Sequence, residues 1–144
     1  MRIVAQRVLE SNVKVDGKVV GEIGKGLMLL VSFTQTDTVN EIDYMVNKVS
    51  NLRIFDDENG IMNLSIKDVG GEVLSISQFT LYGDAKKGNR PSYVAALNGE
   101  EAIKLYDLFN EKLNEIVHVE KGIFGADMKV SLINDGPITI LLEK

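Results

Sequence analysis

The stretch Leu27-Met28-Leu29-Leu30-Val31-Ser32-Phe33 follows Gly24-Lys25-Gly26 and is an almost continuous apolar run. A run of this kind is typical of a β-strand buried on both faces. Upstream, apolar residues surround the turn signal Asp16-Gly17, as they do in a β-hairpin. Further along, residues 72–76 also have the composition of a strand. These segments predict a sheet-based fold.

Two helices are expected beside these strands. Thr38 stands three residues before Glu41, which is the spacing of a capping box, and apolar residues then recur at helical spacing. This pattern predicts a helix that runs to about Leu52. A second helix is expected to begin near residues 98–101. Its buried stripe would consist of Ala102, Leu105, Tyr106, Phe109, Leu113 and Ile116.

Alternating apolar residues precede and follow the corner Asn134-Asp135-Gly136-Pro137 near the end of the chain. Alternation on both sides of a turn predicts two strands that pair with each other. Strands outnumber helices and are joined mostly by short turns. We therefore predict one α+β domain over residues 1–144, built on an antiparallel or mixed sheet.

The composition excludes several classes of protein. Of the 144 residues, 44% are hydrophobic and 26% are charged, as in an ordinary globular domain. No apolar run reaches the roughly 18 residues of a membrane span, and the first residues lack the apolar core of a signal peptide. The absence of cysteine excludes disulfides and thiol chemistry and is consistent with a cytoplasmic location. A net charge of −5 argues against broad, nonspecific binding to nucleic acid, so DNA is not expected as a partner.

Lys86, Lys87 and Arg90 form a short basic cluster on this acidic chain. Such a cluster can hold a phosphate backbone over a short footprint, but from the residues alone a solvated loop is the favoured interpretation.

Few side chains are suited to catalysis. His118 is the only histidine, and it stands on a predicted strand away from any candidate nucleophile, so a nucleophilic triad is dismissed. Asp56-Asp57-Glu58 has the composition of an ordinary turn and lacks supporting histidines, so no metal site is expected there. No cofactor motif is present.

Two polar segments at strand ends remain, namely residues 77–81 and 134–139. Main-chain amides at a break in a strand can converge on one point and stabilise an oxyanion. An alternating strand and a hairpin turn are the structural alternatives for these two segments. Gly136 has no side chain to block a ligand, and a bond that precedes proline can be cis.

The chain resembles the D-aminoacyl-tRNA deacylases over nearly its whole length. The residues that carry the resemblance are Gln6-Arg7-Val8, Ser77-Gln78-Phe79-Thr80-Leu81, Gly88-Asn89-Arg90-Pro91-Ser92-Tyr93, Phe124-Gly125-Ala126-Asp127-Met128 and Asn134-Asp135-Gly136-Pro137-Ile138-Thr139. Asn12 departs from the small apolar residue that is more usual there, and it lies outside these segments. The resemblance implies a barrel-like sheet with two main helices, a homodimer and no cofactor.

The resemblance also implies an activity, namely hydrolysis of the ester in D-aminoacyl-tRNA and in wrongly charged glycyl-tRNA. The implied catalytic residues are Ser77, Gln78, Phe79 and Thr80. The substrate-binding residues would be Arg7, Met128, Asn134, Gly136, Pro137 and Thr139, with the Gly-Pro corner inserted into the partner subunit's site. Lys86, Lys87 and Arg90 would contact the tRNA.

Two points stay open at the level of sequence. Thr80 has been proposed as a nucleophile in this family, but no side-chain base stands near it, and we favour donation from the main chain. The alternative function is a dimeric amino-acid-binding regulatory module without catalysis, which has the same glycine-rich strand ends and the same lack of catalytic side chains.

Overall fold

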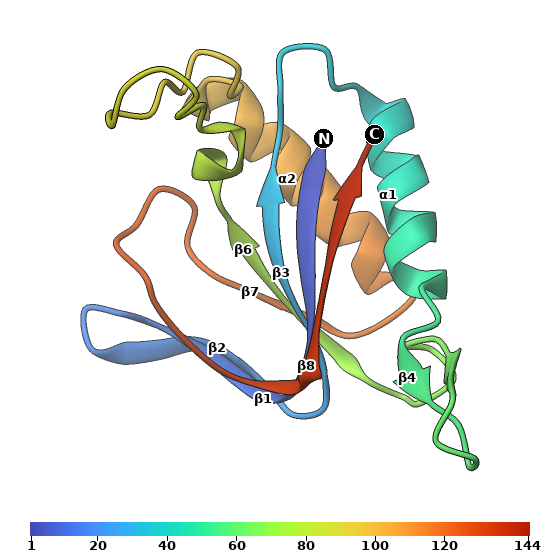
Figure 1. Ribbon diagram of the computed structural model, residues 1–144. Helices are drawn as coiled ribbons and strands as arrows, with labels where there is room; N and C mark the ends of the chain where they lie inside the picture. The colour runs from blue at the N-terminus through green and yellow to red at the C-terminus, as the bar shows by residue number, and fades with distance from the viewer.

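A mixed β-sheet forms the centre of the fold in the computed structural model, which describes residues 1–144 (Figure 1). No helix in it has the length and apolar character needed to cross a membrane. The strands are β1 (Arg2–Val15), β2 (Lys18–Ile23), β3 (Gly26–Ser32), β4 (Phe55–Asp56), β5 (Met62–Leu64), β6 (Glu72–Ser77), β7 (Val119–Lys121) and β8 (Lys129–Glu143). β3, β6 and β7 pair in parallel, whereas β1 pairs antiparallel with β2, β3 and β8.

The long strand β1 curls the sheet until it is nearly closed into a barrel. Residues 2–8 of β1 pair with β3, residues 11–15 pair with β2, and β8 follows the opposite edge of β1. Gly21 of β2 lies so close to β7 that a Cβ atom there would be 3.0 Å from the carbonyl oxygen of Lys121. The glycine therefore permits the close approach that almost closes the barrel.

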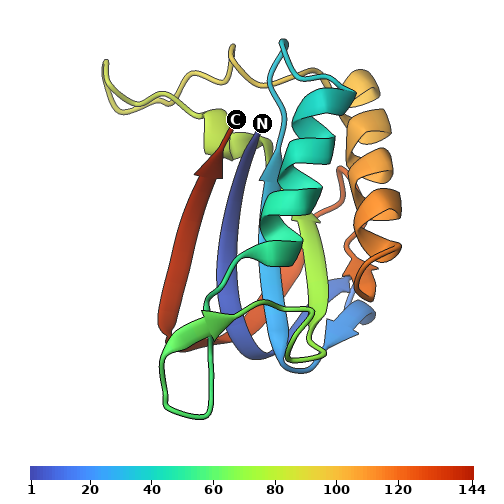
Figure 2. The same cartoon turned by 90° about the vertical axis from the view of Figure 1, so that its right-hand side faces the viewer.

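Two helices, α1 (Val39–Asn51) and α2 (Gly99–Asn114), cover one face of this sheet (Figures 1 and 2). The predicted capping box begins α1, with Thr38 and Glu41 in reciprocal hydrogen bonds, and Asn98 caps α2. Leu27, Leu29 and Val31 of β3 pack beneath the helices, while Met28 belongs to a second apolar cluster on the other face. The prediction of a strand buried on both faces is confirmed.

Three local predictions were wrong. Ile116 lies beyond the end of α2 and is 44% exposed, because the helix stops at Asn114. His118 precedes β7 instead of lying in a strand. The two strands expected around residues 134–137 do not pair with each other, since both belong to the single strand β8 and both pair with β1.

The corner at residues 134–137 is accommodated as a wide bulge in β8. Between the pairs Gln6–Thr139 and Val8–Asn134, β8 contains residues 135–138 where β1 contains only Arg7. Alternation of apolar residues cannot distinguish a bulge from a hairpin, because the period of two resumes after either.

Candidate active site

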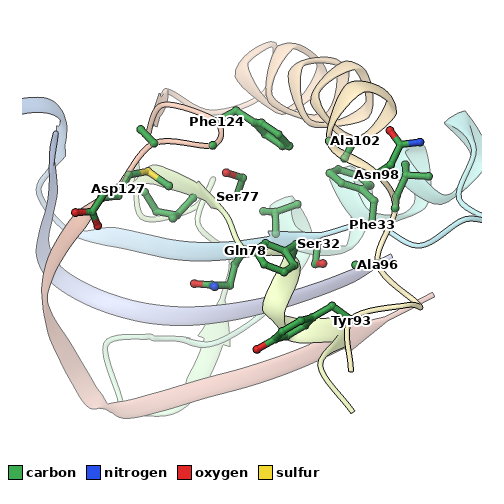
Figure 3. Close-up of a pocket in the computed structure, with 18 of the residues that line it drawn as sticks. Ser32, Phe33, Ser77, Gln78, Tyr93, Ala96, Asn98, Ala102, Phe124 and Asp127 are labelled. Atoms are coloured by element: carbon green, nitrogen blue, oxygen red, sulfur yellow. The ribbon is translucent and has the colours of Figure 1, made fainter. Parts of the chain in front are cut away.

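A cavity of about 590 Å³ opens at the carboxyl ends of β3 and β6, beside the start of α2 (Figure 3). Most of its lining is apolar. Ser77, Gln78 and Phe79 enter it from the end of β6, and Phe124 and Met128 come from the connection between β7 and β8. Of the residues predicted for the site, these are the ones that the structure brings together: Ser77, Gln78, Phe79 and Met128.

The chain changes from strand to helix within this cavity. The amide of Gln78 donates to the carbonyl of Val31 at 2.8 Å and extends the ladder between β3 and β6 by one residue. The 3-10 helix η1 (Phe79–Tyr82) follows, and its first internal hydrogen bond runs from the Leu81 amide to the Gln78 carbonyl. The amides of Phe79 and Thr80 precede that bond and have no partner within the turn. Phe79 also lines the cavity, so its amide is available to an oxyanion there.

The hydroxyl of Thr80 lies beside the side-chain amide of Gln78, which donates a hydrogen bond to it. Thr80 does not line the cavity. The only histidine, His118, is exposed next to β7, where its ring lies 2.9 Å from the Glu120 carboxylate. Neither histidine nor carboxylate is therefore hydrogen-bonded to Thr80 as a base.

Arg2 holds η1 against the sheet. Its guanidinium donates to the Leu81 carbonyl at 2.9 Å and lies 4.5 Å from the centre of the Tyr82 ring. Burial, followed by the charge of Asp37, raises the pKa of Tyr82 to about 12, so this phenol stays neutral at physiological pH. The turn that carries Phe79 and Thr80 is thus fixed at its far end by a cation and a neutral ring.

The Gly-Pro corner lies on the exposed surface of β8, outside the cavity of the same chain. The Gly136-Pro137 peptide bond is cis, and Gly136 has a φ of +122°. A Cβ atom on Gly136 would lie 2.8 Å from the side chain of Ile138, so neither the backbone angle nor the space suits a larger residue.

Arg7 is 6% exposed and fills the bulge opposite this corner. Its guanidinium donates to the Asp135 carbonyl at 3.3 Å and pairs with the Asp135 carboxylate at 3.1 Å. On the other side it donates to the Ile54 carbonyl at 2.9 Å and lies 3.3 Å from the Asp56 carboxylate. Arg7 thus links the residue that precedes the Gly-Pro pair to the hairpin of β4 and β5.

Asn134 and Thr139 stand at the two ends of the bulge. The Asn134 side-chain amide donates to the Ile138 carbonyl and to the Thr139 hydroxyl, both at 3.3 Å. The Asn134 Oδ1 atom is buried and has no hydrogen-bond partner. Neither residue lines the cavity, so within one chain the structure keeps the 134–139 segment apart from Ser77, Gln78 and Phe79.

The basic cluster is exposed on the loop that follows η1, and Tyr93 at the end of this loop lines the cavity. Sequence reasoning assigned no role to Tyr93, nor to Asn98, Phe124 and Asp127, which also line the cavity (Figure 3). Tyr93, Phe124 and Asp127 do lie in segments that carry the resemblance, and this was the available signal.

Asp57 accepts main-chain hydrogen bonds from Asn59 and Ile61, as in an ordinary turn.

Comparison with known proteins identifies the family. The family model for D-Tyr-tRNA(Tyr) deacylase matches residues 4–143. A solved structure of c-Myc DNA Unwinding Element Binding Protein is 40% identical, with a TM-score of 0.95 over 100% of this chain and 99% of that one. The fold also matches a probable eukaryotic D-amino acid tRNA deacylase at 17% identity and a TM-score of 0.84, over 98% of this chain and 97% of that one. The chain therefore belongs to the D-Tyr-tRNA(Tyr) deacylase family, whose members are hydrolases that act on the ester bond of aminoacyl-tRNA.

Proposed function

We propose that the protein is a chiral proofreading enzyme that hydrolyses D-aminoacyl-tRNA and mischarged glycyl-tRNA and rejects L-aminoacyl-tRNA sterically. The observation that carries the proposal is the cavity at the end of β6, where the Phe79 amide, which has no partner within η1, meets an apolar pocket without a catalytic triad. An aminoacyl ester is already activated. Oriented main-chain donors and a positioned water therefore suffice for its hydrolysis.

In the proposed reaction, water adds to the ester carbonyl carbon, and the amide of Phe79, a residue that lines the cavity, stabilises the oxyanion that forms. The carbon–oxygen bond to the ribose then breaks, the ribose oxygen takes up a proton, and a free D-amino acid and tRNA leave. The neighbouring ribose hydroxyl of the substrate assists the proton transfer. The hydrogen bond between Gln78 and the Thr80 hydroxyl supports a positioning role for Thr80 instead of a nucleophilic one.

Chiral selection is assigned to Gly136 and Pro137 of a second subunit. Both residues are exposed, and Arg7 holds the main chain beside them at Asp135. A main-chain wall against the substrate's α-carbon leaves room for a D side chain that points outward, collides with an L side chain and admits glycine. Because the wall is made of backbone, it acts on any amino acid.

A homodimer is proposed because β8 leaves one edge of the sheet unpaired. Figure 2 shows this strand at the outer edge, and it pairs only with β1. Exposed apolar residues lie along β1 and β8, including Leu9, Ile133 and Leu141 at 52%, 49% and 58% exposure. A long apolar edge strand is normally covered, and a second copy would cover it while bringing the corner to the partner's cavity.

Lys86, Lys87 and Arg90 are proposed to contact the tRNA backbone, so that activity falls as salt rises.

The first test is deacylation of D-tyrosyl-tRNA, L-tyrosyl-tRNA and glycyl-tRNA by the purified protein in the presence of chelator. Rapid loss of the D-ester and the glycyl ester, with the L-ester spared, is expected. A folded dimer that hydrolyses none of them and binds a free amino acid would instead establish the non-catalytic binding module.

Variants of the corner and of Thr80 test the mechanism. Gly136→Ala is expected to abolish most D-activity while the protein remains folded, because its Cβ would meet Ile138. Gly17→Ala is the matched control, since Gly17 also has a positive φ of +76°, but a Cβ atom there would meet no other atom within 4 Å. A trapped acyl ester on Thr80, together with complete loss of turnover in Thr80→Ala, would overturn the water mechanism.

A further inference from the structure

An exposed pair of aromatic rings stands at the mouth of the cavity. Phe79 is 57% exposed and Tyr93 is 40% exposed, and both line the cavity. Their ring centres are 5.1 Å apart and their planes meet at 70°. Large aromatic side chains gain stability from burial, so two adjacent rings left in water mark a surface that receives a ligand.

The surrounding backbone fixes the position of Tyr93. Two hydrogen bonds of 2.8 Å between Asp84 and Ser92 close the loop that ends at Tyr93. At the start of that loop, a Cβ atom on Gly83 would lie 2.9 Å from the Tyr93 ring and 3.0 Å from the Thr80 carbonyl. The ring therefore packs on a glycine that leaves room for it, directly beside the turn that carries the proposed oxyanion site.

The same loop carries unpaired positive charge. Lys86, Lys87 and Arg90 are exposed, and none of them has a carboxylate within 4.0 Å. Exposed rings beside free cations are the usual means of binding single-stranded nucleic acid, since bases stack on the rings and the cations follow the phosphates. On a chain with a net charge of −5, the local excess of positive charge selects an anionic partner.

We infer that Phe79 and Tyr93 form a stacking platform for the base of the nucleotide that precedes the terminal adenosine of tRNA. The inference rests on the proposed function. The ester must reach the Phe79 amide inside the cavity, so the preceding nucleotide of the unpaired 3′ end leaves through the mouth, where the rings stand. The next phosphates then pass the three cations of the loop. The platform therefore binds a nucleotide of the tRNA that lies outside the ester-bearing nucleoside.

The test compares two substrates, D-tyrosyl-tRNA and the D-tyrosyl ester of adenosine, which lacks the preceding nucleotide. The measured quantity is the ratio of kcat/KM for the tRNA to kcat/KM for the adenosine ester. Tyr93→Leu is expected to lower this ratio about tenfold, the usual loss for one stacked base. Tyr93→Phe keeps the ring and should restore the ratio to within about twofold of wild type. Tyr44→Leu is the matched control, because Tyr44 is also 40% exposed but lies on α1.

The platform is refuted if Tyr93→Leu leaves the ratio unchanged, or if it lowers both rates equally, which would assign the ring to the ester pocket itself. Hydrolysis of neither substrate by the wild type would refute the proposed function separately. The platform is then judged by fluorescence of 2-aminopurine placed before the 3′-terminal adenosine of a short single-stranded RNA. Saturable quenching that weakens in Tyr93→Leu supports it, and the absence of quenching refutes it.

Discussion

Replacing Arg7 by methionine tests whether this buried guanidinium holds the Gly-Pro corner in place. Methionine keeps an unbranched chain of similar length but removes the charge and all the donors. The guanidinium has four contacts, two with the carbonyl groups of Ile54 and Asp135 and two with the carboxylates of Asp56 and Asp135. All four are lost together in the variant.

The magnitude follows from how exposed each partner is. The bond to the Ile54 carbonyl is short and buried, so its loss costs about 2 kcal/mol, as for a hydrogen bond from a charged donor. The bond to the Asp135 carbonyl is longer, at 3.3 Å, and the two carboxylates have side chains that are 47% and 32% exposed, so water replaces much of what is lost. These three contacts together account for about 1 kcal/mol. The expected decrease in the free energy of unfolding is therefore about 3 kcal/mol, which lowers Tm by roughly 10 °C for a chain of this size.

Urea unfolding followed by far-UV circular dichroism gives the stability, and deacylation of D- and L-tyrosyl-tRNA gives the discrimination. We expect the ratio of D- to L-activity to fall in the folded variant, because the main chain at Asp135 has lost its support. Arg53→Met is the control, since Arg53 donates a single exposed hydrogen bond of 2.9 Å to the Asn63 carbonyl. If Arg7→Met loses no more stability than Arg53→Met and keeps full discrimination, the reasoning is refuted.

Three further predictions concern the core, the cavity mouth and acid stability. Tyr106→Phe should lower the free energy of unfolding by only about 1 kcal/mol, because the Ser75 carbonyl keeps its bond to the Gly122 amide when the phenol is removed; a urea-measured loss above about 3 kcal/mol would contradict this. Gly83→Ala should displace the Tyr93 ring and reduce activity on D-tyrosyl-tRNA more than on the D-tyrosyl ester of adenosine. An equal loss of activity on the two substrates would contradict this prediction. Hydrogen bonds from the Ile61 and Asn59 amides lower the pKa of Asp57 in the folded state, so its contribution to stability is present above the unfolded pKa and is lost as the pH falls through the folded one. Unfolding by urea between about pH 5 and pH 2 should therefore be less pH-dependent in Asp57→Ala than in wild type.

Local signals in the sequence predicted most of the elements. The capping box at Thr38, the turn at Asp16-Gly17 and the doubly buried run of residues 27–33 each depend on neighbouring residues only, and each is present in the structure. The bulge at residues 135–138 could not be predicted, because its existence depends on β1, more than a hundred residues away in the chain.

The two candidate segments stand out in the sequence because each requires an unusual backbone, whereas the aromatic residues that line the cavity do not stand out. Gly136 and Pro137 are distinctive in the sequence, and so is the polar break at residues 77–80. Tyr93 and Phe124 are ordinary aromatic residues that also occur in cores, and only the folded chain shows that they face a cavity. That one segment lines the cavity while the other forms an exposed corner outside it is likewise a property of the tertiary structure alone.

The pairing of β1 with β8 has a consequence for biosynthesis. Residues 2–14 leave the ribosome well before their pairing partners at residues 129–143. Throughout translation of the intervening chain, one edge of β1 has no partner, although its other edge can already pair with β2 and β3. A nascent chain with an unpaired strand edge is prone to aggregate, so chaperone demand is greatest just before synthesis of this segment ends.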